Sequence, residues 1–194
     1  MVKKVIGIFL FFGVMLLISC QSGKPIKRLS DDGIMYAMIY DYDNMPVSGV
    51  TAFINGKKIV DSDIQGRFVL DKMKKGEYRI KLAKKRYESF EETFYFDPLQ
   101  VLYFKIINAP QLAALAEAAL DNKDFSAAEN YIGRALILEP NRPDILFLKS
   151  AVFYLQGRNE ESAEILENLI MAGNNDPPIS LLLESIREAQ PPKE

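Results

Sequence analysis

The chain has 194 residues, of which 48% are hydrophobic and 26% are charged, a composition typical of one or two small folded domains. The formal net charge of −2 disfavours a dedicated nucleic-acid binder. The chain has no His and a single Cys, so it lacks the commonest general acid–base and cannot form an intrachain disulfide. We therefore expect a non-catalytic protein without a cofactor or a metal site.

The first twenty residues have the pattern of an export signal. Two lysines precede an apolar run from Val5 to Ile18, which has the length of a signal-peptide core and is short for a membrane span. The run ends in Leu17-Ile18-Ser19-Cys20, which resembles the lipobox of bacterial lipoproteins. This resemblance implies cleavage between Ser19 and Cys20 and a lipid anchor of the palmitate type on Cys20, in the bacterial cell envelope.

Two alternatives to the lipoprotein signal remain open, a generic secretory signal and a transmembrane anchor with an incidental Cys. Gln21 follows Cys20, and in the enterobacterial sorting rule a residue other than Asp favours the outer membrane, facing the periplasm or the cell surface. Residues 20–32 are polar with Gly and Pro, so we expect a flexible tether after the predicted signal peptide, residues 1–19.

Residues 33–108 have the pattern of a β-sandwich. Short runs with a period of two alternate with turn signals, of which Asn55-Gly56 is a strong hairpin signal. Strands are expected at residues 34–40, 50–54, 57–60, 67–70, 78–83, 89–96 and 101–107. About seven strands at this spacing predict two packed sheets.

Four motifs stand in this region: Pro46-Val47-Ser48-Gly49-Val50, Asp63-Ile64-Gln65-Gly66-Arg67-Phe68, Lys75-Gly76-Glu77-Tyr78 and Arg86-Tyr87. Together they resemble the carboxypeptidase regulatory-like, transthyretin-like domain. The resemblance implies that Gly66 and Gly76 adopt positive φ at tight turns. It also implies that Phe68 and Tyr78 turn their rings toward the core. Residues 88–97 are expected as an additional hairpin arm.

The period becomes helical in residues 109–189. A capping box from Ser126 to Glu129 predicts a helix start, and Pro140 predicts its stop. A shift of 34 residues superposes Ala116 on Ser150 and Ala128 on Ser162, and the pattern resembles tetratricopeptide repeats. We expect two repeats with a capping helix, then a polar tail at residues 190–194. The predicted fold class is α+β, with a β-sandwich module followed by an all-α helical-repeat module.

The two predicted modules differ in charge. Residues 20–108 carry 15 basic and 12 acidic side chains, whereas residues 109–194 carry 7 basic and 14 acidic ones. A partner of the helical module is therefore expected to carry basic residues.

The first helix of each repeat offers the candidate binding residues. The resemblance to tetratricopeptide arrays implies a groove lined by these helices that binds a segment of another envelope protein. The candidates are Ala113, Glu117, Leu120, Asp121, Asp144, Phe147, Ala151 and Tyr154. In the alternative, the repeats pack on the sandwich, and Phe147 and Tyr154 belong to that interface.

Three further patterns in the sequence could indicate a binding site. Asp41, Asp43, Asn44, Asp61 and Asp63 could supply calcium with oxygen ligands, but turn formation explains them more simply. The lysines and arginines between Lys72 and Arg86 fit a solvated strand face better than a site for an anionic partner.

The third pattern is a set of tyrosines in the β region. Tyr36, Tyr40, Tyr42, Tyr95 and Tyr103 would support a carbohydrate or cell-wall binding module if they formed one surface row. The predicted function is thus a membrane-anchored, non-catalytic protein-binding scaffold. A carbohydrate-binding module is the first alternative, and an enzyme accessory subunit is the second. The oligomeric state is left open.

Overall fold

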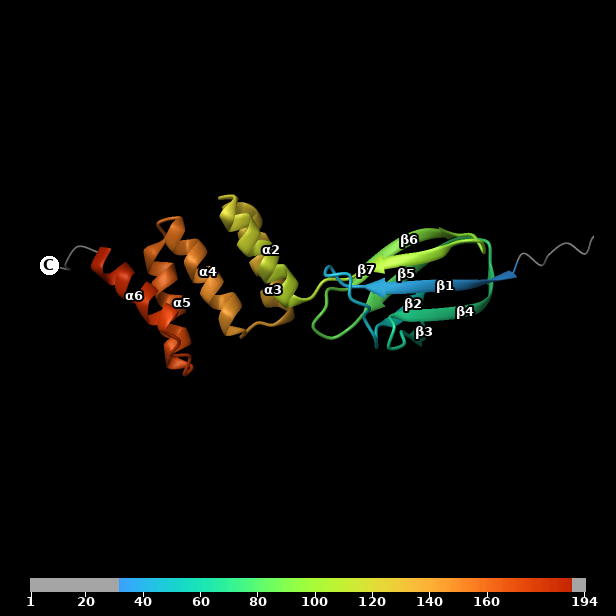
Figure 1. Cartoon of the computed structure of the whole chain (residues 1–194), viewed down its shortest axis with the longest axis horizontal. Coiled ribbons are helices and arrows are strands. Elements are labelled where there is room, and N and C mark those ends of the chain that lie inside the picture. The colour runs from blue at the N-terminus through green and yellow to red at the C-terminus, as the bar shows by residue number, and fades with distance from the viewer. Residues whose placement is uncertain (1–31, 190–194) are drawn as a thin grey trace, which may run out of the picture.

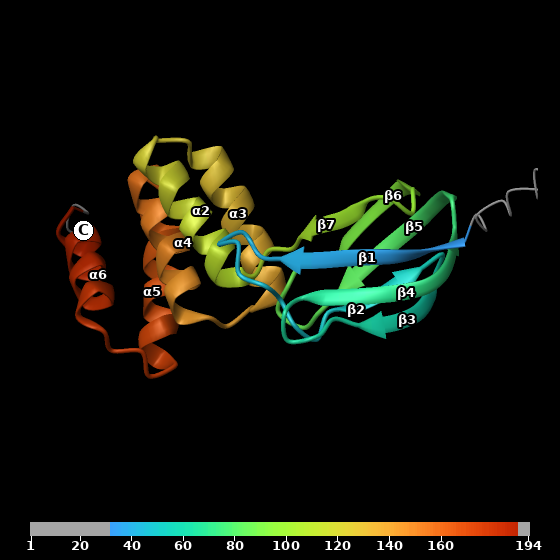
Figure 2. The same cartoon turned by 45° about the vertical axis from the view of Figure 1, so that its right-hand side comes forward.

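The computed structural model describes residues 32–189 of the chain. The predicted signal peptide, Cys20, nearly all of the predicted tether and the predicted polar tail lie outside the described residues. The described chain is elongated, with a β-sandwich at one end and a helical module at the other (Figures 1 and 2). This arrangement confirms the predicted α+β fold class of two modules.

Seven strands form the sandwich, as predicted. They are β1 (Asp32–Tyr40), β2 (Thr51–Ile54), β3 (Lys57–Asp61), β4 (Arg67–Lys74), β5 (Gly76–Ala83), β6 (Phe90–Phe96) and β7 (Val101–Lys105). One sheet has the order β4-β1-β7 and the other has the order β3-β2-β5-β6. The two sheets bury their inner faces against each other, and the outer faces are open to solvent.

Strand β1 is the centre of the smaller sheet, and its residues alternate clearly. Met35, Ala37 and Ile39 point into the core and are buried, whereas Ile34 and Tyr36 are exposed. β1 pairs antiparallel with β4 and parallel with β7. The parallel pair joins segments more than sixty residues apart in the sequence, so it is a long-range pairing that no local turn specifies.

The segment expected as an additional hairpin arm, residues 88–97, contains strand β6 and forms a hairpin with β5. β6 pairs with β5 along its whole length and forms an edge of the four-stranded sheet. Its rings explain this position, because Phe96 is fully buried and both Phe90 and Phe94 pack against the sandwich core. The segment therefore belongs to the sandwich itself.

The glycine turns have the predicted geometry. Gly66 has φ +72° and Gly76 has φ +157°, both in the region that favours glycine. Gly66 lies close to the backbone of β1, and its carbonyl accepts a hydrogen bond of 2.8 Å from the Ile39 amide. Phe68 is buried in the core of the sandwich, and Tyr78 packs against the same core, as expected.

Five helices follow the sandwich: α2 (Ala109–Asp121), α3 (Phe125–Leu138), α4 (Pro143–Leu155), α5 (Asn159–Met171) and α6 (Pro177–Ala189). The starts of α2, α4 and α6 are 34 residues apart, and the starts of α3 and α5 are also 34 apart. The helices contact their neighbours in chain order, and α4 also contacts both α2 and α6. This stacking matches the predicted repeat period.

The predicted capping box at Ser126 and Glu129 is wrong. Asp124 is the N-cap of α3, and its Oδ1 accepts a hydrogen bond of 3.0 Å from the Ala127 amide. Because the helix begins two residues earlier, Ser126 lies inside its first turn. The sequence prediction missed a different capping box, in which the side chains of Asn108 and Gln111 each bond the other's backbone amide at the start of α2.

Small residues allow close helix packing in both repeats. Ala116, Ala128 and Ala135 are completely buried within the first repeat. In the second repeat, Ser150 and Ser162 replace two of these alanines and are also completely buried. The Ser162 hydroxyl donates a 2.8 Å hydrogen bond to the Ser150 carbonyl, so the substitution leaves no unpaired polar group.

Candidate functional surfaces

The predicted groove residues of α2 lie on one face of that helix. Ala113, Glu117, Leu120 and Asp121 are three or four residues apart, which is the spacing of one helical face. Glu117 and Asp121 are exposed, while Leu120 is half-buried and packs against the core of the first repeat. This face of α2 therefore presents carboxylates beside a partly covered leucine.

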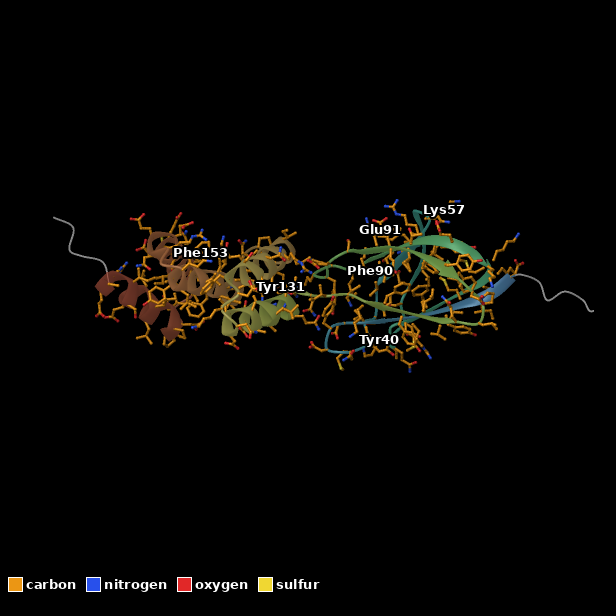
Figure 3. The ribbon with its side chains drawn as sticks, turned by 90° about the horizontal axis from the view of Figure 1, so that it is seen from above. Tyr40, Lys57, Phe90, Glu91, Tyr131 and Phe153 are labelled. Atoms are coloured by element: carbon orange, nitrogen blue, oxygen red, sulfur yellow. The ribbon has the colours of Figure 1, made fainter. Side chains whose placement is uncertain are left out.

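The predicted groove residues of α4 are covered more than those of α2. Phe147, Ala151 and Tyr154 are half-buried. The two rings pack against a cluster of buried residues from α5 and α6. The structure thus places Phe147 and Tyr154 at the contact of α4 with the last two helices, not at the sandwich. Figure 3 shows Phe153, on the neighbouring face of α4, far from the sandwich.

Asp144 begins the same face of α4 and is exposed. Its carboxylate accepts a 2.8 Å hydrogen bond from Arg142 Nε, and Arg142 also pairs with Glu139. Asp144 is therefore partly neutralised, whereas no ion pair among residues 32–189 involves Glu117 or Asp121. The α2 part of the face carries the uncompensated negative charge.

Two exposed leucines on this face were not among the predicted residues. Leu155 is 58% exposed at the end of α4, and Leu181 is 63% exposed on α6. The 34-residue period makes Leu181 the counterpart of Phe147 and Ala113, and makes Leu155 the counterpart of Asp121. Applying the period to the capping helix would have identified Leu181 from the sequence. We use the name first-helix face for the exposed residues at these equivalent positions. They are Glu117 and Asp121 of α2, Asp144 and Leu155 of α4, and Leu181 of α6.

The predicted tyrosines lie on both outer faces of the sandwich. Tyr36 and Tyr40 on β1 and Tyr103 on β7 point outward from the smaller sheet. Tyr95 points outward from the larger sheet, on β6. Figure 3 shows the two sides clearly, with Tyr40 on one and both Lys57 and Glu91 on the other. Three of the five tyrosines therefore share a face, and Tyr42 follows them in the next turn.

A cavity of about 600 Å³ is lined mainly by residues of the smaller sheet, together with Val60 and Asp61 of β3 in the larger sheet. Its lining is mostly apolar, with Asp61, Asp63 and Arg67 as its charged side chains. The lining residues are Tyr36, Ala37, Met38, Val60, Asp61, Asp63, Arg67, Phe68, Val69, Val101 and Tyr103.

The aspartates considered for calcium act mainly within turns. Asp41 Oδ1 accepts hydrogen bonds of 2.9 Å from the amides of Asp43 and Met45. Asp63 Oδ1 accepts bonds from the amides of Gln65 and Arg67, and these bonds lower the pKa of its carboxyl. The turn interpretation of these residues is thus supported by their hydrogen bonds.

The basic stretch is spread over several sites instead of forming one patch. Arg79 and Lys81 lie on the outer face of the larger sheet, where Arg79 pairs with Glu91. Lys84 donates a 2.6 Å hydrogen bond to the Ser48 carbonyl, and Arg86 reaches the helical module. The stretch is therefore a solvated face with local ion pairs.

Two ion pairs join the modules. Arg86 binds Glu139 through two hydrogen bonds of 2.8 and 2.9 Å, and Arg134 binds Glu88 through two of 2.8 and 2.7 Å. Hydrogen bonding to these arginines lowers the pKa of both glutamate carboxyls. Bidentate pairs fix direction as well as distance, so the two pairs set the angle between the modules.

The backbone and Gln111 complete this junction. The Glu88 amide donates a 2.9 Å hydrogen bond to the Ile107 carbonyl, and Gln111 donates from Nε2 to Asp43. Ile106 belongs to the sandwich core, whereas Ile107 belongs to the core of the first repeat. The chain thus passes from one core to the other within two residues.

The family model of the tetratricopeptide repeat matches residues 119–186, from the end of α2 to α6. Proteins with such repeats are typically non-catalytic, and the match indicates a protein–protein interaction scaffold. No curated protein matches the sequence.

Solved structures match part of the chain at low similarity. A streptococcal ancillary pilin is 21% identical, with 40% of this chain and 29% of that chain covered and a TM-score of 0.32. The major pilin subunit of Bacillus cereus is 14% identical, with 40% and 28% covered and a TM-score of 0.32. For 3-chlorocatechol 1,2-dioxygenase from Rhodococcus opacus 1CP, the identity is 13%, the coverage 42% and 60%, and the TM-score 0.30. The chain spans less than a third of either pilin.

The helices between residues 32 and 189 are all too short or too polar to cross a bilayer. The apolar run from Val5 to Ile18 lies outside that range.

Proposed function

We propose that the chain is a lipid-anchored scaffold of the bacterial cell envelope, which binds a basic, partly apolar segment of another envelope protein through the first-helix face. The observation that carries the proposal is the composition of this face. Leu155 and Leu181 are exposed on this face, the rings of Phe147 and Tyr154 are half-buried, and Glu117 and Asp121 form no ion pair among the described residues. An exposed apolar patch with a charged rim is typical of a protein-binding surface.

The membrane anchor in this proposal rests on the N-terminal sequence. The only Cys of the chain follows Leu17-Ile18-Ser19, directly after the apolar run. Several acyl chains at Cys20 would hold the protein stably on a bilayer, since each buried CH₂ contributes about 0.8 kcal/mol. Such an anchor would restrict partners to proteins that reach the same membrane.

The anchor is tested in the native host by substituting Cys20→Ala. The substitution removes the sulfur that would carry the lipid, so we expect loss of fatty-acid labelling and release from the membrane fraction. A variant that remains both labelled and membrane-bound would contradict the lipoprotein assignment. Gln21→Ala serves as the control, because it changes a neighbour of Cys20 and leaves the lipobox intact.

The binding face is tested with a photo-crosslinking amino acid placed at Leu155 or at Leu181 in the full chain. We expect both positions to give one crosslinked product of the same mass. Ile137 is the control position, because it is 80% exposed but lies on α3, outside the first-helix face. Equal crosslinking from Ile137, or no discrete product from either leucine, would contradict the proposed face.

The expected charge preference is tested by adding Glu117→Lys and Asp121→Lys to the Leu181 crosslinking variant. A basic partner would be repelled, so the crosslinked product should fall by about tenfold, with the helical circular-dichroism signal unchanged. Undiminished crosslinking in the charge-reversed chain would show that the partner is not recognised by its basic residues.

A further inference from the structure

The outer face of the smaller sheet is unusual in its composition. Exposed sheet faces of antiparallel sandwiches are normally polar, and the larger sheet follows this rule with Arg79, Lys81 and Glu91. On the smaller sheet, Tyr36 lies between Val69 of β4 and Val101 of β7 in register, and all three side chains are exposed. A continuous apolar strip thus crosses this sheet from edge to edge.

The next row of the same face adds a second tyrosine and an arginine. Met38 pairs in register with Arg67 on β4 and with Tyr103 on β7. Tyr103 is 67% exposed and lies diagonally across from Tyr36, at the separation of about 7–8 Å that diagonal neighbours have. Two aromatic side chains therefore stand next to each other over the floor of the 600 Å³ cavity.

The charges of the cavity compensate one another. Arg67 Nη2 lies 2.9 Å from Asp63 Oδ2, and Lys58 Nζ lies 3.2 Å from Asp61 Oδ2. No side chain of the lining thus offers an uncompensated charge to a charged ligand. The acceptor positions of Asp63 are taken by the amides of Gln65 and Arg67 and by the Arg67 guanidinium, whereas that guanidinium, with five N–H donors, keeps donors for a ligand. The electrostatics fit an uncharged ligand with many hydroxyl groups.

The tyrosines add a preference for shape. Aromatic rings present broad, flat apolar surfaces with a polar tip, and they lose little conformational entropy on binding. A sugar ring has matching features, with C–H groups on its faces and hydroxyls around its rim. A cavity of this size lies in the range of small-ligand sites, about 300–1,000 Å³.

From the aromatic strip, the cavity and its balanced charges, we infer that the outer face of β4, β1 and β7 binds a neutral glycan, with Tyr36 and Tyr103 stacking on sugar rings and the Arg67 guanidinium donating hydrogen bonds to hydroxyls. This site is on the opposite module from the first-helix face and does not depend on it. An envelope scaffold with such a site would hold its protein partner beside a polysaccharide.

The test measures fluorescence anisotropy of labelled cellohexaose, xylohexaose, maltohexaose and chitohexaose with the full chain in detergent. At least one neutral hexasaccharide should bind. Tyr36→Ala and Tyr103→Ala should each weaken its affinity by about tenfold, whereas Tyr103→Phe, which keeps the ring, should retain it within about threefold.

Tyr95→Ala is the matched control, because Tyr95 is 58% exposed on the larger sheet and lies outside the cavity. It should bind as the unchanged chain does. The inference is overturned if none of the four hexasaccharides binds or if Tyr95→Ala weakens binding as much as Tyr103→Ala. It is also overturned if the cavity residues crosslink to a protein instead of a glycan. Glycan binding would be unaffected by a loss of crosslinking from Leu181. The proposed glycan site and the proposed first-helix face can therefore be rejected independently.

Discussion

Gly66 and Gly56 have almost the same backbone conformation but different surroundings. Their φ angles are +72° and +79°, which are costly for any residue with a Cβ. A Cβ on Gly56 would meet no atom within 4 Å. A Cβ on Gly66 would press on the Ile39 carbonyl of β1, and Val47 N, in the segment after β1, would be only 3.0 Å away. Glycine is thus required at residue 66 for two reasons and at residue 56 for one.

We expect Gly56→Ala to lower the free energy of unfolding by about 1 kcal/mol, the cost of the left-handed conformation alone. Gly66→Ala should lower it by at least about 2 kcal/mol, because the backbone of β1 cannot move aside easily. Urea unfolding of the two variants measures the difference. Equal losses would mean that the turn at Gly66 relaxes and that the contact with β1 is unimportant.

Individual residues were predictable where the reason is local. The Asp63–Phe68 motif predicted both a positive φ at Gly66 and a buried Phe68, since a tight turn and the following strand are set by adjacent residues. The cap of α3 was mispredicted because Asp124 and Ser126 both precede the same apolar face. Only the hydrogen bond from the Ala127 amide distinguishes them.

The last helix, α6, closes the hydrophobic core of the second repeat. Leu183 and Ile186 are buried against Leu166 and Leu169 of α5. Leu181, two residues before Leu183, faces solvent. α6 therefore supplies the packing that a third stacked unit gives in longer arrays.

Leu183→Ala should lower the free energy of unfolding of the helical module by about 2–5 kcal/mol, the range for truncating a buried leucine. Leu181→Ala should change it by less than about 0.5 kcal/mol, because an exposed side chain loses little packing. Thermal unfolding followed by circular dichroism at a helical wavelength compares the two. Similar destabilisation by both variants would show that α6 is covered on its outer side.

At the level of secondary-structure elements, the helices were more predictable from the sequence than the strand pairings. The 34-residue period fixes the starts of α2, α4 and α6 because each helix pair repeats local contacts. The parallel pairing of β7 with β1 depends on residues far apart, and no local pattern specifies it. The tyrosine face follows from that pairing, since it brings Tyr103 beside β1. The sequence could therefore name the tyrosines but could not separate Tyr95 from the others.

At the scale of the whole molecule, the junction decides whether the modules behave as one body. Apolar contact at the junction is modest, with Ile107 as the buried residue that leads from the sandwich into the helical core. Arg86–Glu139 and Arg134–Glu88 supply the directional contacts. The change of period predicts two modules, and the ion pairs between them favour coupled unfolding at neutral pH and low salt.

This coupling should depend on pH. The pKa of Glu88 and that of Glu139 are lowered in the folded protein, chiefly by the hydrogen bonds from Arg134 and Arg86. A lowered carboxyl pKa stabilises the folded junction above the unfolded value, about 4.3 for glutamate, and this stabilisation is lost as the pH falls through the folded value. The modules should therefore unfold together at pH 7, and their coupling should weaken progressively as the pH falls below about 4.3.

The double substitution Glu88→Gln and Glu139→Gln should reproduce the acidic behaviour at neutral pH. Glutamine keeps the size of each side chain but removes its charge, so each arginine loses its ionic partner while the packing at Ile107 remains. Urea unfolding is followed by tyrosine fluorescence, to which the sandwich region contributes seven of the nine tyrosines, and by helical circular dichroism for the repeats. The two signals should then give two separate midpoints. Glu91→Gln is the control, because it breaks the Arg79 pair within one sheet and leaves the junction intact. Coincident midpoints in the double variant would mean that the backbone hydrogen bond from Glu88 to Ile107 and the contact of Gln111 with Asp43 are enough to join the modules.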